Sequence, residues 1–350
     1  MIQKLICFLA ICYAAQALRA QTYTNPVVRG VNVPDPGVIL HKGHYYAVTT
    51  GGSASGKFPI RVSTDLVNWK HVGYVFPKQH EPKWVSDSFW APEIHVVNGK
   101  FHVYYTGREA SSGILCIGVA SSTTILGPYT DKGSPLVKNT TVGSIDSHMF
   151  KDGNTSYLIW KADGNGKTPR IPTPIWAQPL TADGFGLTGH KTQLITDDLT
   201  WEHGLVEAPW IINTRGYYYL FYSAACYDDN TYAVGVARSK SLLGPYTKHS
   251  TPILHTSDHF IGPGHCSVVT SSSDQSKFLM VYHAWKPDPK GRHGHGAHRL
   301  ILVDEVKWTS DNWPYITGEV PSATAQPMPL SSKQATPKFE IEDELIVKNI

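Results

Sequence analysis

The sequence predicts an all-β fold, a five-bladed β-propeller, from three observations. Runs of aromatic and β-branched residues recur five times, each run follows a turn residue, and no convincing helical periodicity occurs after the first twenty residues. The runs begin 56, 54, 63 and 60 residues apart. They are GHYYAVTTGG (43–52), GKFHVYYTG (99–107), GNTSYLIWKADG (153–164), GYYYLFYSAA (216–225) and SKFLMVYHAW (276–285). Repeats of this length, each with about four strands, are typical of propeller blades around a central channel.

Each run is preceded by a second apolar run, so every pair predicts a β-hairpin. The preceding runs contain DPGVIL, APEIHVV, DSHMF, EAPWII and GHCSVV. Further along, CIGVASSTTILGPYT (116–130) and AVGVARSKSLLGPYT (233–247) match almost residue for residue at an offset of 117, about two repeats. We therefore expect Gly-Pro-Tyr at equivalent outer positions of the second and fourth blades. The main alternative, a β-sandwich, would not recur at a long fixed period with matching turns.

The chain divides into three parts. Residues 1–20 have a Lys near the start, a short apolar stretch and small residues, which predicts a secretory signal peptide cleaved near Ala17 or Ala20. A membrane anchor is the weaker alternative, because the apolar run is shorter than the roughly 20 residues of a spanning helix. Residues 21–319 form the propeller, with 21–30 and 298–308 in its last blade. Residues 320–350, rich in Ser, Pro and charge, predict a flexible tail, or alternatively a docking segment.

Composition restricts the partners. Of the 350 residues, 41% are hydrophobic and 17% charged, and the net charge of +3 comes without any Lys/Arg block, which excludes nucleic acid as an electrostatic partner. We expect a secreted monomer that does not bind membranes. The 18 Tyr and 10 Trp are typical of β-rich folds and of sites that stack on sugars. Beyond the leader, Cys116, Cys226 and Cys266 allow at most one disulfide, and we expect mostly buried, apolar cysteines.

One ionisable residue stands near the start of each predicted first strand. These residues are Asp35, Glu93, Asp146, Glu207 and His265, spaced 58, 53, 61 and 58 residues apart. Any one of them alone would be interpreted as a turn residue bonded to nearby backbone. Five in register predict a cluster on the propeller axis, where carboxylates raise each other's pKa and are retained mainly for chemistry or ion binding.

Tryptophans lie beside two of these acids, in FWAPE (89–93) and VEAPW (206–210). Carboxylates next to exposed rings suit glycoside hydrolysis, in which one acid protonates the leaving oxygen and a second carboxylate activates water or attacks the anomeric carbon.

The ordered set PDPGVI, FWAPEIH, IDSHMF, VEAPWI and GPGHCS resembles glycoside hydrolase family 43 over roughly residues 25–318. The resemblance implies a five-bladed propeller that hydrolyses plant-type glycans with inversion. It also implies Asp35 as the general base, Glu207 as the general acid and Asp146 as the carboxylate that orients the acid and tunes its pKa. We expect a raised pKa for Glu207, caused by Asp146 and Trp210, and a separation of about 6.5–9.5 Å between Asp35 and Glu207.

The resemblance further implies that His265 helps to hold a cation, often Ca²⁺, in the channel. The alternative is a histidine bonded to channel water, since Ca²⁺ prefers oxygen ligands. No organic cofactor is expected. Glu93 is interpreted either as a residue near the sugar or as a structural one. The remaining candidates for substrate contact are Trp90, Phe89, His148, His283 and Arg299. The segment GRHGHGAHR (291–299) predicts a loop over the channel mouth rather than a metal site.

The substrate is predicted to be terminal α-L-arabinofuranose in arabinan or arabinoxylan-type polysaccharides. A β-xylosidase or an exo-galactanase would use the same three acids. A non-catalytic sugar-binding propeller is the alternative from another class, although all three catalytic positions retain acids. A propeller for protein–protein interaction would give no reason for acids in register.

Overall fold

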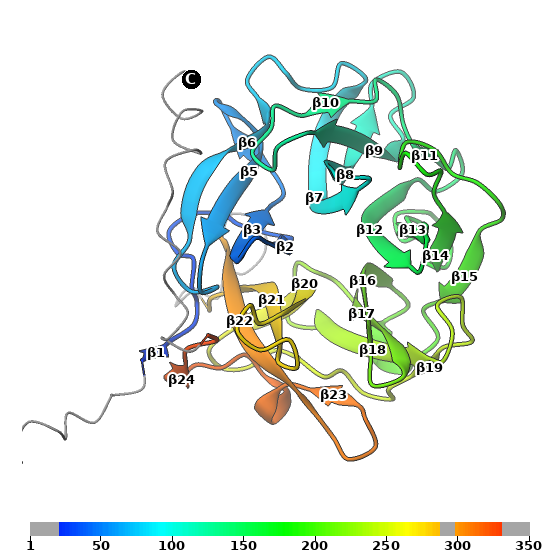
Figure 1. Ribbon diagram of the computed structural model, residues 1–350. Coiled ribbons are helices and arrows are strands. Elements are labelled where there is room, and N and C mark those ends of the chain that lie inside the picture. Colours follow the sequence, from blue (N-terminus) through cyan, green and yellow to red (C-terminus); the bar gives the residue numbers. More distant parts are fainter. Residues whose placement is uncertain (1–20, 288–297, 331–350) are drawn as a thin grey trace, which may run out of the picture.

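The computed structural model describes residues 21–287 and 298–330, and it confirms a five-bladed β-propeller (Figure 1). The predicted signal peptide, most of the GRHGHGAHR segment and residues 331–350 lie outside the described residues. The first strand of each blade lies nearest the axis. These inner strands are β2 (Gly37–His41), β7 (Val85–Val97), β12 (Ser144–Asp152), β16 (Val206–Thr214) and β20 (Ile261–Thr270). Inner strands of consecutive blades contact one another, and β20 contacts β2 to close the ring.

The other strands continue each blade outward in antiparallel order. Blade 1 contains β3 (His44–Val48), β4 (Gly52–Ser53), β5 (Gly56–Ser63) and β6 (Lys70–Pro77), and blade 2 contains β8 (Lys100–Glu109), β9 (Leu115–Ser122), β10 (Thr130–Asp131) and β11 (Val137–Lys138). Blade 3 contains β13 (Thr155–Ala162), β14 (Ile175–Pro179) and β15 (Thr192–Ile195), and blade 4 contains β17 (Tyr217–Ala224), β18 (Ala233–Ser239) and β19 (Thr247–Lys248). Blade 5 contains β21 (Phe278–Trp285), β22 (Arg299–Trp308) and β23 (Pro314–Tyr315). In the described part of the chain, helix is limited to two 3-10 turns, Thr200–Glu202 and Thr317–Glu319.

The second and fourth blades share the outer structure that their sequence match predicts. Each Gly-Pro-Tyr lies between the third and fourth strands of its blade, where the tyrosine hydroxyl donates to the carbonyl four residues earlier. In both blades a tyrosine of the second strand pairs across the sheet with a glycine of the third: Tyr105 with Gly118, and Tyr222 with Gly235. A tryptophan stacks on each tyrosine, Trp84 in one case and Trp201 in the other.

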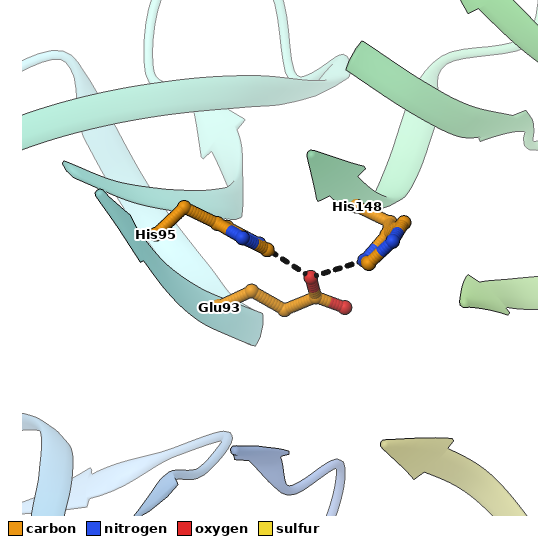
Figure 2. A group of neighbouring side chains, drawn as sticks. All are labelled: Glu93, His95 and His148. Carbon is orange, nitrogen blue, oxygen red and sulfur yellow. Dashed lines mark hydrogen bonds and ion pairs between the residues drawn. The ribbon is translucent and has the colours of Figure 1, made fainter. Parts of the chain in front are cut away.

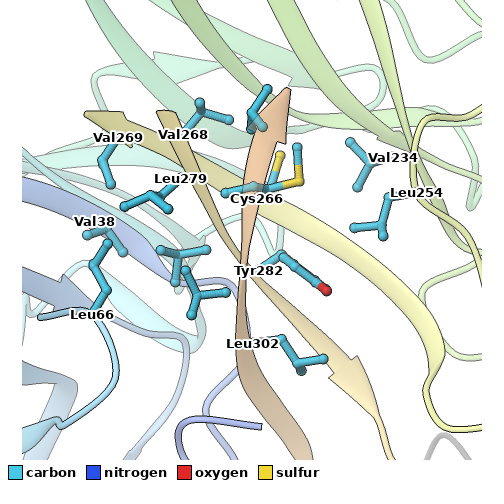
Figure 3. Packing of buried hydrophobic residues seen from close by; sticks show 14 of the residues in the cluster. Val38, Leu66, Val234, Leu254, Cys266, Val268, Val269, Leu279, Tyr282 and Leu302 are labelled. Carbon is cyan, nitrogen blue, oxygen red and sulfur yellow. The ribbon is translucent and has the colours of Figure 1, made fainter. Parts of the chain in front are cut away.

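Hydrophobic clusters fill the spaces between neighbouring blades, and the largest joins blades 4, 5 and 1. Figure 3 shows part of that cluster, in which Cys266 and Tyr282 of blade 5 lie among aliphatic side chains. The prediction of buried cysteines is confirmed for Cys116 and Cys266 but wrong for Cys226, which is exposed. All three are free thiols. The core is thus held by packing and β-sheet hydrogen bonds, without a disulfide between these cysteines.

The two ends of the described chain meet at blade 5. Val27 and Val28 donate their backbone N–H groups to the carbonyl of Ile301 on β22, and the side chains of Tyr23 and Asn25 bond to the backbone of Val303. Only Val28 forms a β-bridge there, so 21–30 adds one bridge and side-chain bonds rather than a full strand. Strand β1 (Thr22–Tyr23) instead pairs with β24 (Gln326–Pro327). Ordered contacts therefore extend into the predicted tail as far as Leu330, which is buried in the largest cluster.

The glycine beneath Tyr222 gives a test of this packing. A Cβ on Gly235 would lie 2.6 Å from Cζ of Tyr222, which is fully buried, and 2.8 Å from Cη2 of Trp201, which is partly buried and stacks on Tyr222. We expect Gly235→Ala to lower the free energy of unfolding by about 1–3 kcal/mol, the usual cost of overpacking. Gly166→Ala is the control, because nothing lies within 4 Å of its Cβ position. Equal urea midpoints for the two variants would contradict the close fit.

Candidate active site

Each blade has a residue with left-handed backbone geometry either in its inner strand or, for Asp35, two positions before it. We call these five residues the bulge ring: Asp35, Ala91, Asp146, Ala208 and His265, with φ between 44° and 55°. In blades 2 to 5 the strand register shifts at this residue, which is the mark of a β-bulge. Because a bulge bends the strand and re-aims its side chains, the ring explains how polar groups reach the axis from strands whose outer parts are apolar.

A hydrogen bond from the preceding blade holds each residue of the bulge ring. Thr50 accepts the N–H of Ala91, Thr106 that of Asp146, and Ser223 that of His265. The N–H of Asp35 donates to Nδ1 of His283 at 3.1 Å, which joins blade 5 to blade 1. Only the N–H of Ala208 goes to another member of the ring, Oδ2 of Asp146 at 3.2 Å. All five blades are therefore linked through the backbone at the site.

The structure corrects the alignment of the five polar residues. Asp35, Asp146 and His265 occupy the bulge ring, but Glu93 follows Ala91 by two positions and Glu207 precedes Ala208 by one. The Ala-Pro pair shared by the two motifs would have indicated this offset, because the acid follows the bulged alanine in FWAPE but precedes it in VEAPW. The five residues therefore lie at three different levels along the strands.

Asp35 is buried and surrounded by cationic or polar nitrogen. Its Oδ1 lies 3.1 Å from Nη1 of Arg299, 3.3 Å from Nδ1 of His283 and 3.4 Å from Nδ1 of His265. Burial raises the pKa of Asp35, but Arg299 and the histidines lower it by more, so the net pKa is well below its usual range. Asp35 is an ionised carboxylate at neutral pH, and Arg299 rather than backbone donors keeps it so.

Asp146 has no cation beside it at hydrogen-bond distance among the described residues. It accepts the Ala208 N–H and has its own N–H bound by Thr106. Burial raises the pKa of Asp146 to about 7, with the nearby Glu207 adding to the rise and His265 opposing it. Near neutral pH this carboxyl is therefore divided between its protonated and ionised forms.

Glu207 is held by two donors. Nζ of Lys161 lies 2.8 Å from its Oε2, and the Tyr232 hydroxyl donates to its Oε1 at 2.8 Å. Burial raises the pKa of Glu207, but Lys161 and Tyr232 lower it by more, so the net pKa is below the usual value. The expected raised pKa of Glu207 is thus wrong for the free protein, because the sequence interpretation omitted Lys161.

Glu93, His95 and His148 form a group that could hold a metal ion, since one ligand atom from each lies within 4.8 Å of the others (Figure 2). Oε2 of Glu93 lies 2.8 Å from both histidines. The backbone N–H of Ile211 donates to Nε2 of His148, so the proton of that ring stands on Nδ1, facing Glu93. A metal on Nδ1 would require the proton on Nε2, opposite another N–H. The donor set therefore fits a hydrogen-bonded clamp better than a metal centre.

Of the five remaining side chains predicted to contact substrate, three are exposed or lie beside Asp35, whereas Phe89 and His148 are buried in packing contacts. Trp90 is exposed, whereas Phe89 is buried in the cluster between blades 1 and 2, where its ring packs edge-on against Phe58. His148 is 2% exposed, and its ring packs at a tilt of 39° against Trp210. His283 and Arg299 both contact Asp35, and in the described residues Nε2 of His283 and Nε of Arg299 have no hydrogen-bond partner.

Sequence reasoning missed Lys161, Tyr232 and Tyr227. Tyr227 is exposed and lies 5.0 Å from the guanidinium of Arg299. Lys161 could have been found by aligning the second strands, because the equivalent positions of the other blades have no lysine. Tyr227 and Tyr232 lie in a connecting loop without a repeat, so no pattern pointed to them.

The clamp gives a second test. Removing the His148 ring leaves the Glu93 carboxylate and the Ile211 N–H buried without this partner, so we expect His148→Ala to lower the free energy of unfolding by about 3 kcal/mol. His190→Ala, an exposed histidine, should change it by less than about 0.5 kcal/mol. Similar losses in chemical denaturation would show that the clamp is not a stabilising unit.

Known proteins resemble this chain over most of its length. The family model for glycosyl hydrolases family 43 matches residues 23–314. A solved structure described as a thermostable family-43 glycoside hydrolase superimposes with a TM-score of 0.79 at 31% identity, covering 89% of this chain and all of that one.

Curated relatives are more distant. The chain is 27% identical to an extracellular exo-α-(1→5)-L-arabinofuranosidase of Streptomyces avermitilis, covering 86% of this chain and 64% of that enzyme. It is also 27% identical to extracellular endo-α-(1→5)-L-arabinanase 1 of Bacillus subtilis, over 80% of this chain and 86% of that enzyme. A xylan 1,3-β-xylosidase of Vibrio is 25% identical. Because the family model spans all five blades, which also carry Asp35, Asp146 and Glu207, the chain belongs to glycosyl hydrolases family 43.

Proposed function

We propose that the protein is an inverting glycosidase that releases terminal α-L-arabinofuranose from arabinan or arabinoxylan-type polysaccharides. The observation that carries the proposal is that three acids lie in three different environments: Asp35 is ionised beside Arg299, Asp146 has a raised pKa, and Glu207, with 12% of its side chain exposed, contacts Lys161. Carboxyl groups whose pKa values differ in this way suit opposite roles in acid–base catalysis. The arabinan-acting relatives support the choice of sugar.

Asp35 acts as the general base in this proposal. Its low pKa leaves it ionised over the working pH range, ready to accept a proton from water. The water then attacks the anomeric carbon on the face opposite the leaving group, which inverts the configuration. Arg299 and His283 hold Asp35 in place: Nη1 of Arg299 lies 3.1 Å from its Oδ1, and Nδ1 of His283 accepts its backbone N–H.

Glu207 acts as the general acid and shares one proton with Asp146. A glycosidic oxygen can only accept a hydrogen bond, so its arrival beside Glu207 favours the protonated carboxyl over the carboxylate bound to Lys161. Asp146 holds the backbone at Ala208, next to Glu207, and its raised pKa makes it the store of the proton in the free protein. The exposed Trp90 provides an apolar face for a sugar ring.

Calcium in the channel remains a prediction, and no step depends on it. The metal-capable group found among the described residues does not include His265, whose Nδ1 faces Asp35. Ca²⁺ takes six to eight oxygen ligands, so an ion beside His265 would be held mainly by water. Secretion is also proposed. Several relatives are named extracellular, and none of the helices in the described residues is long and apolar enough to cross a bilayer.

The substrate is tested by following the anomeric NMR signals during digestion of arabino-oligosaccharides and xylo-oligosaccharides. Arabinose that first appears as the β-anomer would establish both the sugar and inversion. Release of xylose would retain the mechanism and change the substrate. Binding without turnover of either sugar would favour the non-catalytic alternative.

The two catalytic roles predict different responses to the leaving group. We expect Glu207→Gln to lower kcat on arabinobiose by about 10²–10⁴, but far less on an aryl arabinofuranoside whose leaving group needs no proton. Asp35→Asn should impair both substrates alike, because water must be activated in either case. Equal loss on both substrates in Glu207→Gln would contradict its role as the acid.

The pH dependence of kcat/KM follows from the signs of the pKa shifts. Because the pKa of Asp35 is lowered, the base stays ionised, and activity should persist, at pH values below the usual pKa of an aspartate side chain. The pair of Asp146 and Glu207 must keep one proton, and the raised pKa of Asp146 places its loss near pH 7. We expect kcat/KM for arabinobiose to fall about tenfold per unit above that pH. A flat profile to pH 9 would contradict the shared proton.

A further inference from the structure

A five-fold comparison singles out Lys161. At the position where the second strand of a blade meets the next bulge ring residue, four blades carry a hydrogen-bond acceptor: Thr50, Thr106, Ser223 and His283. Blade 3 has Lys161 there, opposite Ile145 on the inner strand. An ammonium has three donors and no acceptor, so it cannot bind the N–H of Ala208. Asp146 takes that N–H instead, and Lys161 turns to Glu207.

Lys161 is buried, with its side chain 1% exposed, and two carboxylates compensate its charge. Glu207 lies at 2.8 Å and Asp163 at 3.2 Å from Nζ. A buried lysine without such partners would lose its proton, but here the carboxylates more than offset the effect of burial and raise its pKa. Lys161 is therefore a fixed positive charge beside Glu207.

We propose that Lys161 is a positioning residue: its ammonium, 2.8 Å from Glu207, fixes the Glu207 carboxylate in the free protein and sets the highest pH at which the pair of Asp146 and Glu207 still shares a proton. The inference rests on the proposed role of Glu207 as the acid and adds what controls it. Asp163 also contacts Lys161, and its negative charge partly offsets the effect of the Lys161 ammonium on Glu207.

The other charged and titratable groups that face Glu207 come from four elements. Asp146 lies on β12, Tyr232 in the turn before β18, His265 on β20 and Cys226 after β17. Among these, His265 favours the ionised form of Glu207 and Asp146 opposes it. Lys161 is the cation in direct contact, so its removal has a predictable sign.

The test compares kcat/KM against pH for Lys161→Met, Lys161→Arg and Asp163→Asn on arabinobiose. Without the ammonium, the pair of Asp146 and Glu207 keeps its shared proton to higher pH, so the alkaline limb of Lys161→Met should move up by about one unit or more. Lys161→Arg keeps the charge and should restore the position of the limb. Asp163→Asn strengthens the effect of Lys161 and should move the limb down. An alkaline limb of Lys161→Met that coincides with the parent would overturn the proposal.

Two further measurements keep the test decisive. If Lys161→Met does not fold, the test relies on Asp163→Asn, whose alkaline limb of kcat/KM should move to lower pH. An alkaline limb of Asp163→Asn that is unchanged or moves to higher pH overturns the inference. If the protein hydrolyses neither sugar, the proposed function fails separately. The contact is then tested by ¹³C NMR titration of protein labelled at glutamate carboxyls, with Glu207→Gln for assignment. Glu207 should titrate at higher pH in Lys161→Met, and an identical titration in both proteins would overturn the inference.

Discussion

The whole site depends on one repeated interaction, the hydrogen bond that each blade gives to the bulged backbone of the next. A non-glycine residue with φ near 50° is strained and persists only where its surroundings hold it. Here a side chain of the preceding blade binds the N–H of the bulged residue at four of the five positions, and Asp146 binds it at the fifth. The bonds join the blades into a ring and at the same time orient Asp35, Asp146 and His265 toward the axis.

The acids of the site differ from one another because two blades depart from the five-fold pattern of hydroxyl side chains. His283 replaces a hydroxyl in blade 5 and brings an imidazole against Asp35. Lys161 replaces one in blade 3 and brings an ammonium against Glu207. The two substitutions, together with Arg299, give neighbouring acids different protonation behaviour although they stand on similar strands. A five-fold scaffold thus places an ionised carboxylate beside Arg299 and a carboxyl with a raised pKa near Lys161, which the proposed mechanism assigns to the base and acid sides.

The sequence predicted the blades because their hairpins recur at a nearly constant period, and the Gly-Pro-Tyr match identified equivalent places in blades 2 and 4. It predicted Asp35 and Asp146 in register, but it misplaced Glu93 and Glu207 because a bulge adds residues that a spacing argument does not count. Phe89 was assigned to sugar binding, whereas the structure buries it, since an aromatic residue in an inner strand can face either the core or the axis. The influence of Lys161 on Glu207 depends on a contact 46 residues apart in the chain, which no local pattern shows.

The position of Asp35, the proposed base, at the junction between blades 5 and 1 has a consequence for stability. Asp35 receives its backbone support from His283, and this bond lies between blade 5 and blade 1, where the two ends of the described chain also meet. Parts of a protein open with different free energies. At the junction between blades 5 and 1 the described chain crosses only through the N-terminal segment, whose Val27 and Val28 donate their backbone N–H groups to Ile301 on β22. A transient parting of these two blades would release the base from His283 and Arg299 while the other four junctions stayed intact. Inactivation by heat would then precede loss of β-structure. A ligand that contacts both blade 1 and blade 5 would stabilise the closed ring against this opening.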